Sequence, residues 1–231
     1  MDGALAEPPS LLHAELADGL HAMAQPLTIL RGAMCALTLR EEMEPANRRY
    51  LDMSATQVDR LCDLMSGMQS LLYAAQNKVE FASFDLMEAL DAILDRQQAS
   101  AGESGVQIAV TKPDHSLYVF ADQQGVEQAL SAALKTALSG ARKDDRIEIE
   151  IAPRDGFAEV MLRNDNFRER SLGSFERFNL TVVETMIRNQ CGIYEYTDRP
   201  FSISLRLRVS EYLGAVVTSD CLQMAAESVI C

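Results

Sequence analysis

The sequence lacks any run of about 18 apolar residues, so it is not expected to contain a membrane-spanning helix. Its first ten residues, MDGALAEPPS, have neither the basic nor the apolar region of a secretion signal. Basic residues are also scarce, since 21 Lys and Arg stand against 34 Asp and Glu and give a formal net charge of −13. That balance disfavours a nucleic-acid partner, which would require a basic surface.

Cysteine and histidine are too few or too scattered to indicate a metal site. The five cysteines are odd in number and contain no C-x-x-C pair, so their spacing predicts neither a zinc site nor a disulfide framework. Free thiols of this kind are typical of the reducing cytoplasm, which is the expected location. The cysteines are Cys35, Cys62, Cys191, Cys221 and Cys231, and the histidines are His13, His21 and His115.

Two heptad repeats dominate the first third of the chain. Apolar residues recur at steps of three and four over 16–37 and again over 51–72, which is typical of helices that pack at shallow angles. After a flexible arm (1–10), residues 11–78 are therefore expected to form an antiparallel helical hairpin about 45 Å long. Two copies would complete a four-helix bundle by dimerisation. The alternative is that helices from the rest of the chain cover the hairpin.

Residues 79–209 have the pattern of an α+β domain. Alternating segments at 147–151 and 158–162, separated by a Pro-Arg-Asp-Gly turn, predict a β-hairpin. Apolar periodicity predicts helices from about residue 84, over 125–138 and over 180–188, with loops or irregular structure at 100–105 and 163–176. We expect helices over an antiparallel-rich sheet, followed by a C-terminal tail (210–231) of unknown role with a short helix near 222–229.

A proline and a histidine interrupt the first heptad repeat. Pro26 lacks the amide that would bond the Ala22 carbonyl, so the helix is expected to bend there. One turn earlier stands His21, whose imidazole has an ordinary pKa near 6.5 and can act as a neutral nucleophile at physiological pH. His-x4-Pro is a weak pattern by itself, and the alternative is a surface histidine beside an accidental proline.

The order of elements and several motifs together resemble the core of bacterial sensor histidine kinases over residues 10–209. The motifs are His21 with Gln25-Pro26-Leu27-Thr28, then Arg60-Leu61, Phe84-Asp85-Leu86, and Ala121-Asp122 before Val126. The resemblance implies a dimerisation and phosphotransfer hairpin (11–78) followed by a Bergerat-type α/β sandwich (79–209). It also implies that His21 is the phosphoacceptor, supported by Gln25 and Pro26, and that response-regulator receiver domains dock on Ala24, Thr28 and Arg31.

The residues that such kinases use to phosphorylate themselves are absent. The acidic residue expected after the histidine is Ala22, and the glycine-rich nucleotide loop is replaced by the bulky segment 175–179. Because bound Mg-ATP needs positioned oxygen ligands and close backbone approach, we expect neither ATP nor magnesium to bind this domain. The degenerate nucleotide-site positions are Ala132, Thr136, Asn164, Asn166 and Asn179.

The sequence therefore favours a homodimeric histidine phosphotransferase that relays phosphoryl groups between receiver-domain aspartates through His21 without ATP. One alternative is a scaffold that docks regulators or a kinase without carrying phosphate. A further alternative is an ATP-dependent autokinase with atypical motifs.

Overall fold

The computed structural model describes residues 11–38, 44–75, 79–165 and 172–210. The chain divides into two compact units, Met1–Asn77 and Lys78–Cys231. The arm 1–10, Asn166 and the tail from residue 211 onwards lie outside the described residues, as do the side chains of His21, Ala22 and Pro26.

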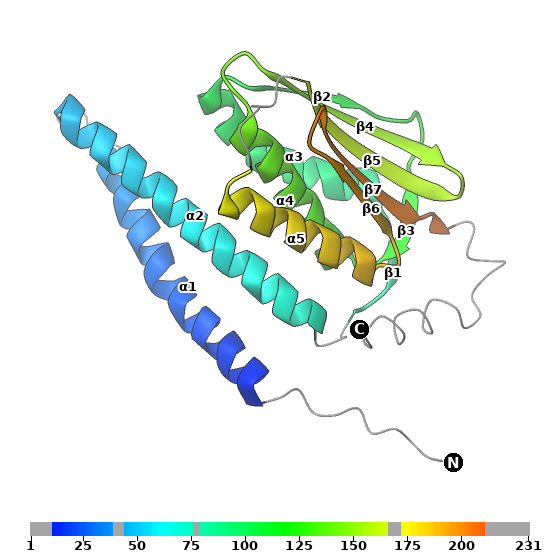
Figure 1. Cartoon of the computed structure of the whole chain (residues 1–231), viewed down its shortest axis with the longest axis horizontal. Helices are drawn as coiled ribbons and strands as arrows, with labels where there is room; N and C mark the ends of the chain where they lie inside the picture. The colour runs from blue at the N-terminus through cyan, green and yellow to red at the C-terminus, as the bar shows by residue number, and fades with distance from the viewer. Residues whose placement is uncertain (1–10, 39–43, 76–78, 166–171, 211–231) are drawn as a thin grey trace. The chain divides into compact units, whose positions relative to one another are not determined.

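The first unit consists of two long helices, α1 (Leu11–Thr38) and α2 (Pro45–Ala75), which lie side by side (Figure 1). Although the sequence predicts a bend at Pro26, the helical structure of α1 continues on both sides of it. An ion pair joins the two helices, with Nε of Arg31 2.7 Å from Oδ1 of Asp59.

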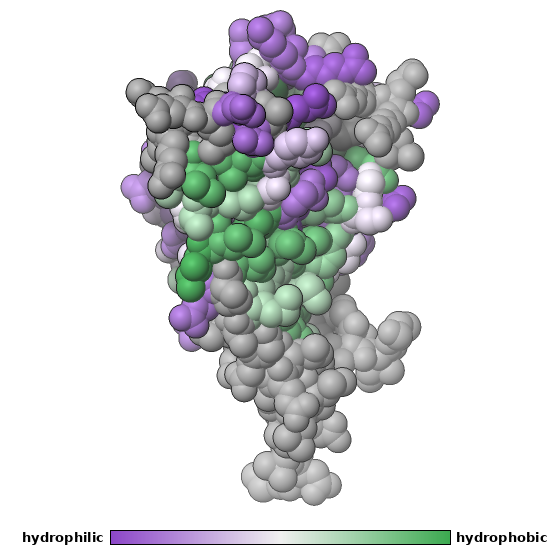
Figure 2. Space-filling model, turned by 90° about the vertical axis from the view of Figure 1, so that its left-hand side faces the viewer, coloured by the Kyte–Doolittle hydropathy of each residue, from purple (hydrophilic) through white to green (hydrophobic). Residues whose placement is uncertain are grey.

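The heptad residues of α1 divide into a covered set and an exposed set. Leu20 is buried and Leu27 and Met34 are half-buried, whereas Met23, Leu30 and Leu37 are exposed at the same spacing of seven. On α2, Val58 and Met65 are buried while Leu61 and Met68 are exposed. Figure 2 shows apolar side chains gathered on the face that the hairpin presents. One hairpin therefore leaves much of its apolar surface in water.

The second unit is an α/β sandwich built around a five-stranded sheet of order β2-β4-β5-β7-β6. Strands β2 and β4 are parallel and the other neighbours antiparallel, while β1 and β3 form a separate two-stranded sheet. The helices α3, α4 and α5 lie on one side of the larger sheet (Figure 1). The elements are β1 (Ala82–Asp85), α3 (Leu86–Ser104), β2 (Gln107–Thr111), β3 (Tyr118–Ala121), α4 (Gln123–Gly140), β4 (Arg146–Arg154), β5 (Phe157–Asn164), α5 (Ser174–Asn189), β6 (Ile193–Thr197) and β7 (Phe201–Arg208).

The core of this unit follows from the alternation of its strands. Along β4, Ile147, Ile149 and Ile151 are buried, and the residues between them are exposed. Because successive strand residues point to opposite faces, these isoleucines share the face that the helices cover. The other face carries charged residues, which are exposed along β4, whereas Glu159 of β5 is buried beside Arg154 and Arg206.

Three boundaries differ from those that the sequence predicts. Strand β1, which was not expected, precedes α3, and Asp85 caps that helix by accepting a hydrogen bond from the Met87 amide. Helix α3 continues through the expected loop at 100–105, because buried Ala101 holds its last turn in the core and Gly105 (φ 67°) supplies the left-handed stop. Helix α5 begins at Ser174 rather than at 180, so the last three residues of the segment 163–176 are helical rather than irregular.

Candidate functional site

The predicted phosphoacceptor His21 lies on α1, one turn before Gln25 and two turns before Thr28. Residues at spacings of four and seven share one face of a helix, so these three positions lie in line. Gln25 and Thr28 are exposed. The face of α1 that contains His21 is therefore distinct from the covered face with Leu20 and Leu27.

The predicted docking residues lie on the same helix and are partly engaged in it. The Thr28 hydroxyl donates a hydrogen bond of 2.8 Å to the Ala24 carbonyl, one turn earlier. Ala24 is half-buried, and exposed Arg31 is held by Asp59 of α2. These residues offer a predominantly uncharged surface, with the Arg31 charge compensated.

In the second unit, the two positions at which the resemblance places magnesium ligands, Ala132 and Thr136, both lie on α4. Thr136 is fully buried, and its hydroxyl donates a 2.8 Å hydrogen bond to the carbonyl of Ala132. Its own carbonyl accepts a further hydrogen bond from Ser139. A hydroxyl bonded back to its own helix is a helix-internal group, and Ala132 offers no side-chain oxygen at all.

Two further nucleotide-site positions are buried between the sheet and the helices. Asn164 ends β5 and lies on the same face as Val160 and Leu162, which the helices cover. Asn179 is buried on α5, and its Nδ2 has no hydrogen-bond partner among the described residues. The carboxamides of both residues thus lie in the interior of the sandwich.

A carboxylate occupies the start of α5, where the resemblance places a phosphate. The N-terminus of a helix normally attracts anions through its free amides and its dipole. Here Oε2 of Glu176 lies 2.6 Å from the place that a Cβ on Gly173 would take, so the carboxylate folds back over the N-cap. Glutamate at the third helical position typically does this, which is the sequence signal that could have revealed it.

Helices α4 and α5 are joined directly by Gln190, which the sequence did not single out. Its buried side chain accepts a 2.7 Å hydrogen bond from the Asp122 amide at the start of α4. Its Nε2 lies 2.7 Å from the place of a Cβ on Gly125, so a larger residue at position 125 would require the Gln190 side chain to shift. Asp122 in turn caps α4 by accepting hydrogen bonds from the Gln124 and Gly125 amides. The two helices therefore meet through a fitted polar contact.

Replacing Gln190 with alanine is expected to lower the free energy of unfolding by about 1–3 kcal/mol, because the buried Asp122 amide loses its acceptor. Urea unfolding followed by circular dichroism measures this loss. Gln123→Ala is the matched control, since exposed Gln123 bonds only Glu127 on the surface, and it should change stability by less than about 0.5 kcal/mol. Equal effects of the two substitutions would contradict the assignment.

Taken together, the residues present do not fit Mg-ATP. Buried Thr136 is committed to a backbone carbonyl, and the Glu176 carboxylate would repel a phosphate from the α5 N-terminus. Magnesium would need several positioned oxygen ligands. The described residues contain no group of three or more His, Cys, Asp or Glu side chains that could hold a metal ion.

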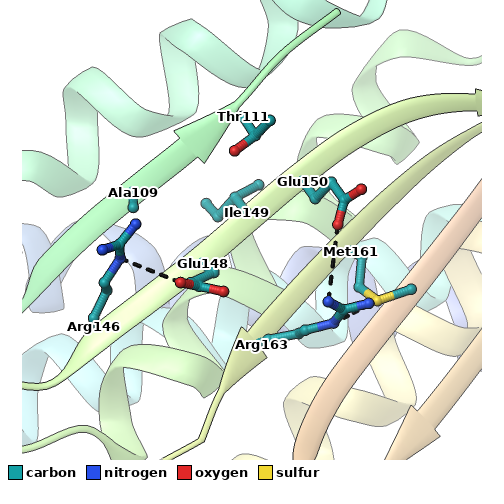
Figure 3. A pocket seen from close by; sticks show the side chains of 8 residues that line it. All are labelled: Ala109, Thr111, Arg146, Glu148, Ile149, Glu150, Met161 and Arg163. Atoms are coloured by element: carbon teal, nitrogen blue, oxygen red, sulfur yellow. Dashed lines mark hydrogen bonds and ion pairs between the residues drawn. The ribbon is translucent and has the colours of Figure 1, made fainter.

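A depression of about 90 Å³ lies elsewhere, on the open face of the sheet (Figure 3). Its walls are the paired charges Arg146 with Glu148 (3.3 Å) and Arg163 with Glu150 (3.9 Å). Ligand pockets usually measure about 300–1,000 Å³. This depression has room for only a few water molecules, and its charges are paired with one another, so it is not a candidate site.

No protein-family model and no curated protein matches the sequence. Solved structures do match. The histidine kinase AdeS of Acinetobacter baumannii is 14% identical, with a TM-score of 0.55 over 82% of this chain and 98% of that chain. Full-length ShkA in complex with AMPPNP is 16% identical, with a TM-score of 0.56 over 85% of this chain, which spans 46% of ShkA.

Among the described helices, none is both long and apolar enough to cross a membrane. At these identities the likeness concerns the fold alone. The chain has a histidine kinase-like fold, in which the second unit is an α/β sandwich similar to the ATP-binding domains of those kinases.

Proposed function

We propose that this protein acts in two-component signalling as a histidine phosphotransferase that uses His21 and does not use ATP. The observation that carries the proposal is the contrast between the two units. In the second unit, where the resemblance places the nucleotide site, the Thr136 hydroxyl is bonded to the Ala132 carbonyl, and the Glu176 carboxylate lies near Gly173 at the start of α5. The face of α1 that contains His21 is lined by exposed Gln25 and Thr28.

The reaction needs little from this chain beyond a nucleophile and a surface. A ring nitrogen of His21 attacks the phosphorus of a receiver aspartyl phosphate. The new P–N bond forms as the P–O bond breaks, and the aspartate leaves as a carboxylate. Transfer to a second receiver reverses these steps. The receiver domain holds the magnesium ion that neutralises the phosphoryl charge, so an acidic residue at Ala22 is not required.

The proposed assembly is a homodimer whose four helices form a bundle. The exposed residues Met23, Leu30 and Leu37 repeat every seven positions, which is typical of helices that pack along a shared apolar seam. A second copy would bury them with Leu61 and Met68 of α2. Isologous dimers are the commonest way to cover such a face, and dimerisation leaves the His21 face open to receiver domains.

Two alternatives predict different results. A scaffold would bind receiver domains equally well with or without His21 and would carry no phosphate. An autokinase would bind Mg-ATP, and both the internal hydrogen bond of Thr136 and the carboxylate of Glu176 at the start of α5 argue against it.

The test is incubation of the purified chain with receiver domains that carry labelled phosphate, beside a calorimetric titration with Mg-ATP. We expect the label to appear on the chain and the titration to show no binding. Receiver binding without label would favour the scaffold. Measurable Mg-ATP affinity followed by labelling from ATP would favour the autokinase.

A further inference from the structure

An aromatic surface is exposed on the small sheet of the second unit. In β3, Tyr118 and Phe120 point outward, whereas Val119 and Ala121 are buried. Phe81, just before β1, stacks on Phe120 with ring centroids 5.7 Å apart and planes at 24°. The exposed fractions are 39% for Phe81, 49% for Tyr118 and 36% for Phe120. We call these three side chains the aromatic face.

The residues that follow β7, the last strand of the larger sheet, lie beside the aromatic face. After β7, Val209 forms a bridge with Val119 of β3. The next residue, Ser210, shares a 2.7 Å hydrogen bond between hydroxyls with Ser83 of β1. Ser83 is the register partner of Phe120, so the last described residue lies directly beside the aromatic pair.

The residues that follow have a suitable composition for covering aromatic rings. Residues 211–231 contain three acidic residues and no basic residue, and most of the others are apolar. Tyr212 and Leu213 come first. An extended chain advances about 3.3 Å per residue. Two or three residues beyond Ser210 are therefore long enough to span the distance along β3 between Phe120 and Tyr118.

We propose that residues 211–231 dock on the aromatic face of the same chain, with Tyr212 and Leu213 packed against Phe120, Tyr118 and Phe81. Burial of apolar surface drives the contact, and the tether at Ser210 removes most of the entropic cost of bringing the two together. Because Phe81 follows the junction of the two units at Asn77 and Lys78, the docked segment also restrains the residues that lead into β1.

A tryptophan probe tests the proposal, since the sequence contains no tryptophan. Tyr118→Trp places the only indole of the protein on the aromatic face. We expect its fluorescence to be shielded from acrylamide in the full chain. In a chain that ends at Ser210, we expect a red shift and a higher quenching constant. Ile193→Trp is the control, because Ile193 is similarly exposed on edge strand β6 and should not respond.

A second variant guards against misfolding of the shortened chain. In the full chain with Tyr118→Trp, the double substitution Tyr212→Ser and Leu213→Ser should raise the quenching constant as truncation does. The proposal is overturned if both changes leave the quenching constant unaltered. It is also overturned if shielding disappears on dilution, because a second copy of the chain would then be the cover.

Discussion

The His21→Ala protein will take up no phosphoryl group from phosphorylated receiver domains that label the wild-type chain. Alanine has no nucleophilic nitrogen, so the P–N bond cannot form. The substitution should preserve α1, because alanine is the strongest helix former and the position lies well inside the helix, which runs from Leu11 to Thr38. The measurement is transfer of labelled phosphate, with binding of the receiver domain determined in parallel to show that docking is retained.

His13→Ala provides the matched control within the same helix. His13 lies eight residues before His21 on α1, about 12 Å away along the axis, so it cannot replace the phosphoacceptor. Its substitution should leave transfer unchanged. Equal labelling of wild-type and His21→Ala proteins would refute the proposed role, whereas loss of both labelling and binding in His21→Ala would point to a damaged docking surface.

Patterns of hydrophobic periodicity were sufficient to predict most elements of this fold. The alternation of β4 and the heptads of α1 and α2 are local signals, because each depends on residues that are neighbours in sequence. Strand β1 escaped prediction since its four residues acquire their strand only by pairing with β3. The start of α5 at Ser174 was also not predicted, because the first turn of the helix does not continue the apolar repeat of its buried part. Val182, Val183 and Ile187 are the buried residues that hold the helix in the core.

In the candidate site, too, some features could be predicted from local sequence and others depend on contacts between distant residues. The resemblance in the sequence predicts which nucleotide-binding residues are replaced. It could not indicate what the replacements do, because this depends on contacts between distant segments. Gln190 contacts Asp122 from 68 residues away. The hydrogen bond of Thr136 within its own helix and the folded-back carboxylate of Glu176 are the details that turn missing motifs into an argument against nucleotide binding.

Leu30→Asp is expected to convert the proposed dimer into a monomer. Leu30 is 47% exposed in the single chain, so the substitution should not unfold the hairpin. In a two-fold dimer it occurs twice, and each copy loses the burial of one leucine, worth about 1.5–3 kcal/mol. The total of roughly 3–6 kcal/mol corresponds to a dissociation constant raised about 100- to 20,000-fold. Sedimentation equilibrium of the two proteins measures this change.

Ile29→Asp is the control that distinguishes dimerisation along the line of Met23, Leu30 and Leu37 from association through any exposed apolar residue. Ile29 is even more exposed than Leu30, at 65%, but it lies about 100° further round the helix and off the line of Met23, Leu30 and Leu37. If a second copy packs on that line, Ile29→Asp leaves the dissociation constant nearly unchanged. Equal weakening by both substitutions, or a wild-type protein that is monomeric at the highest concentrations, would contradict the proposed bundle.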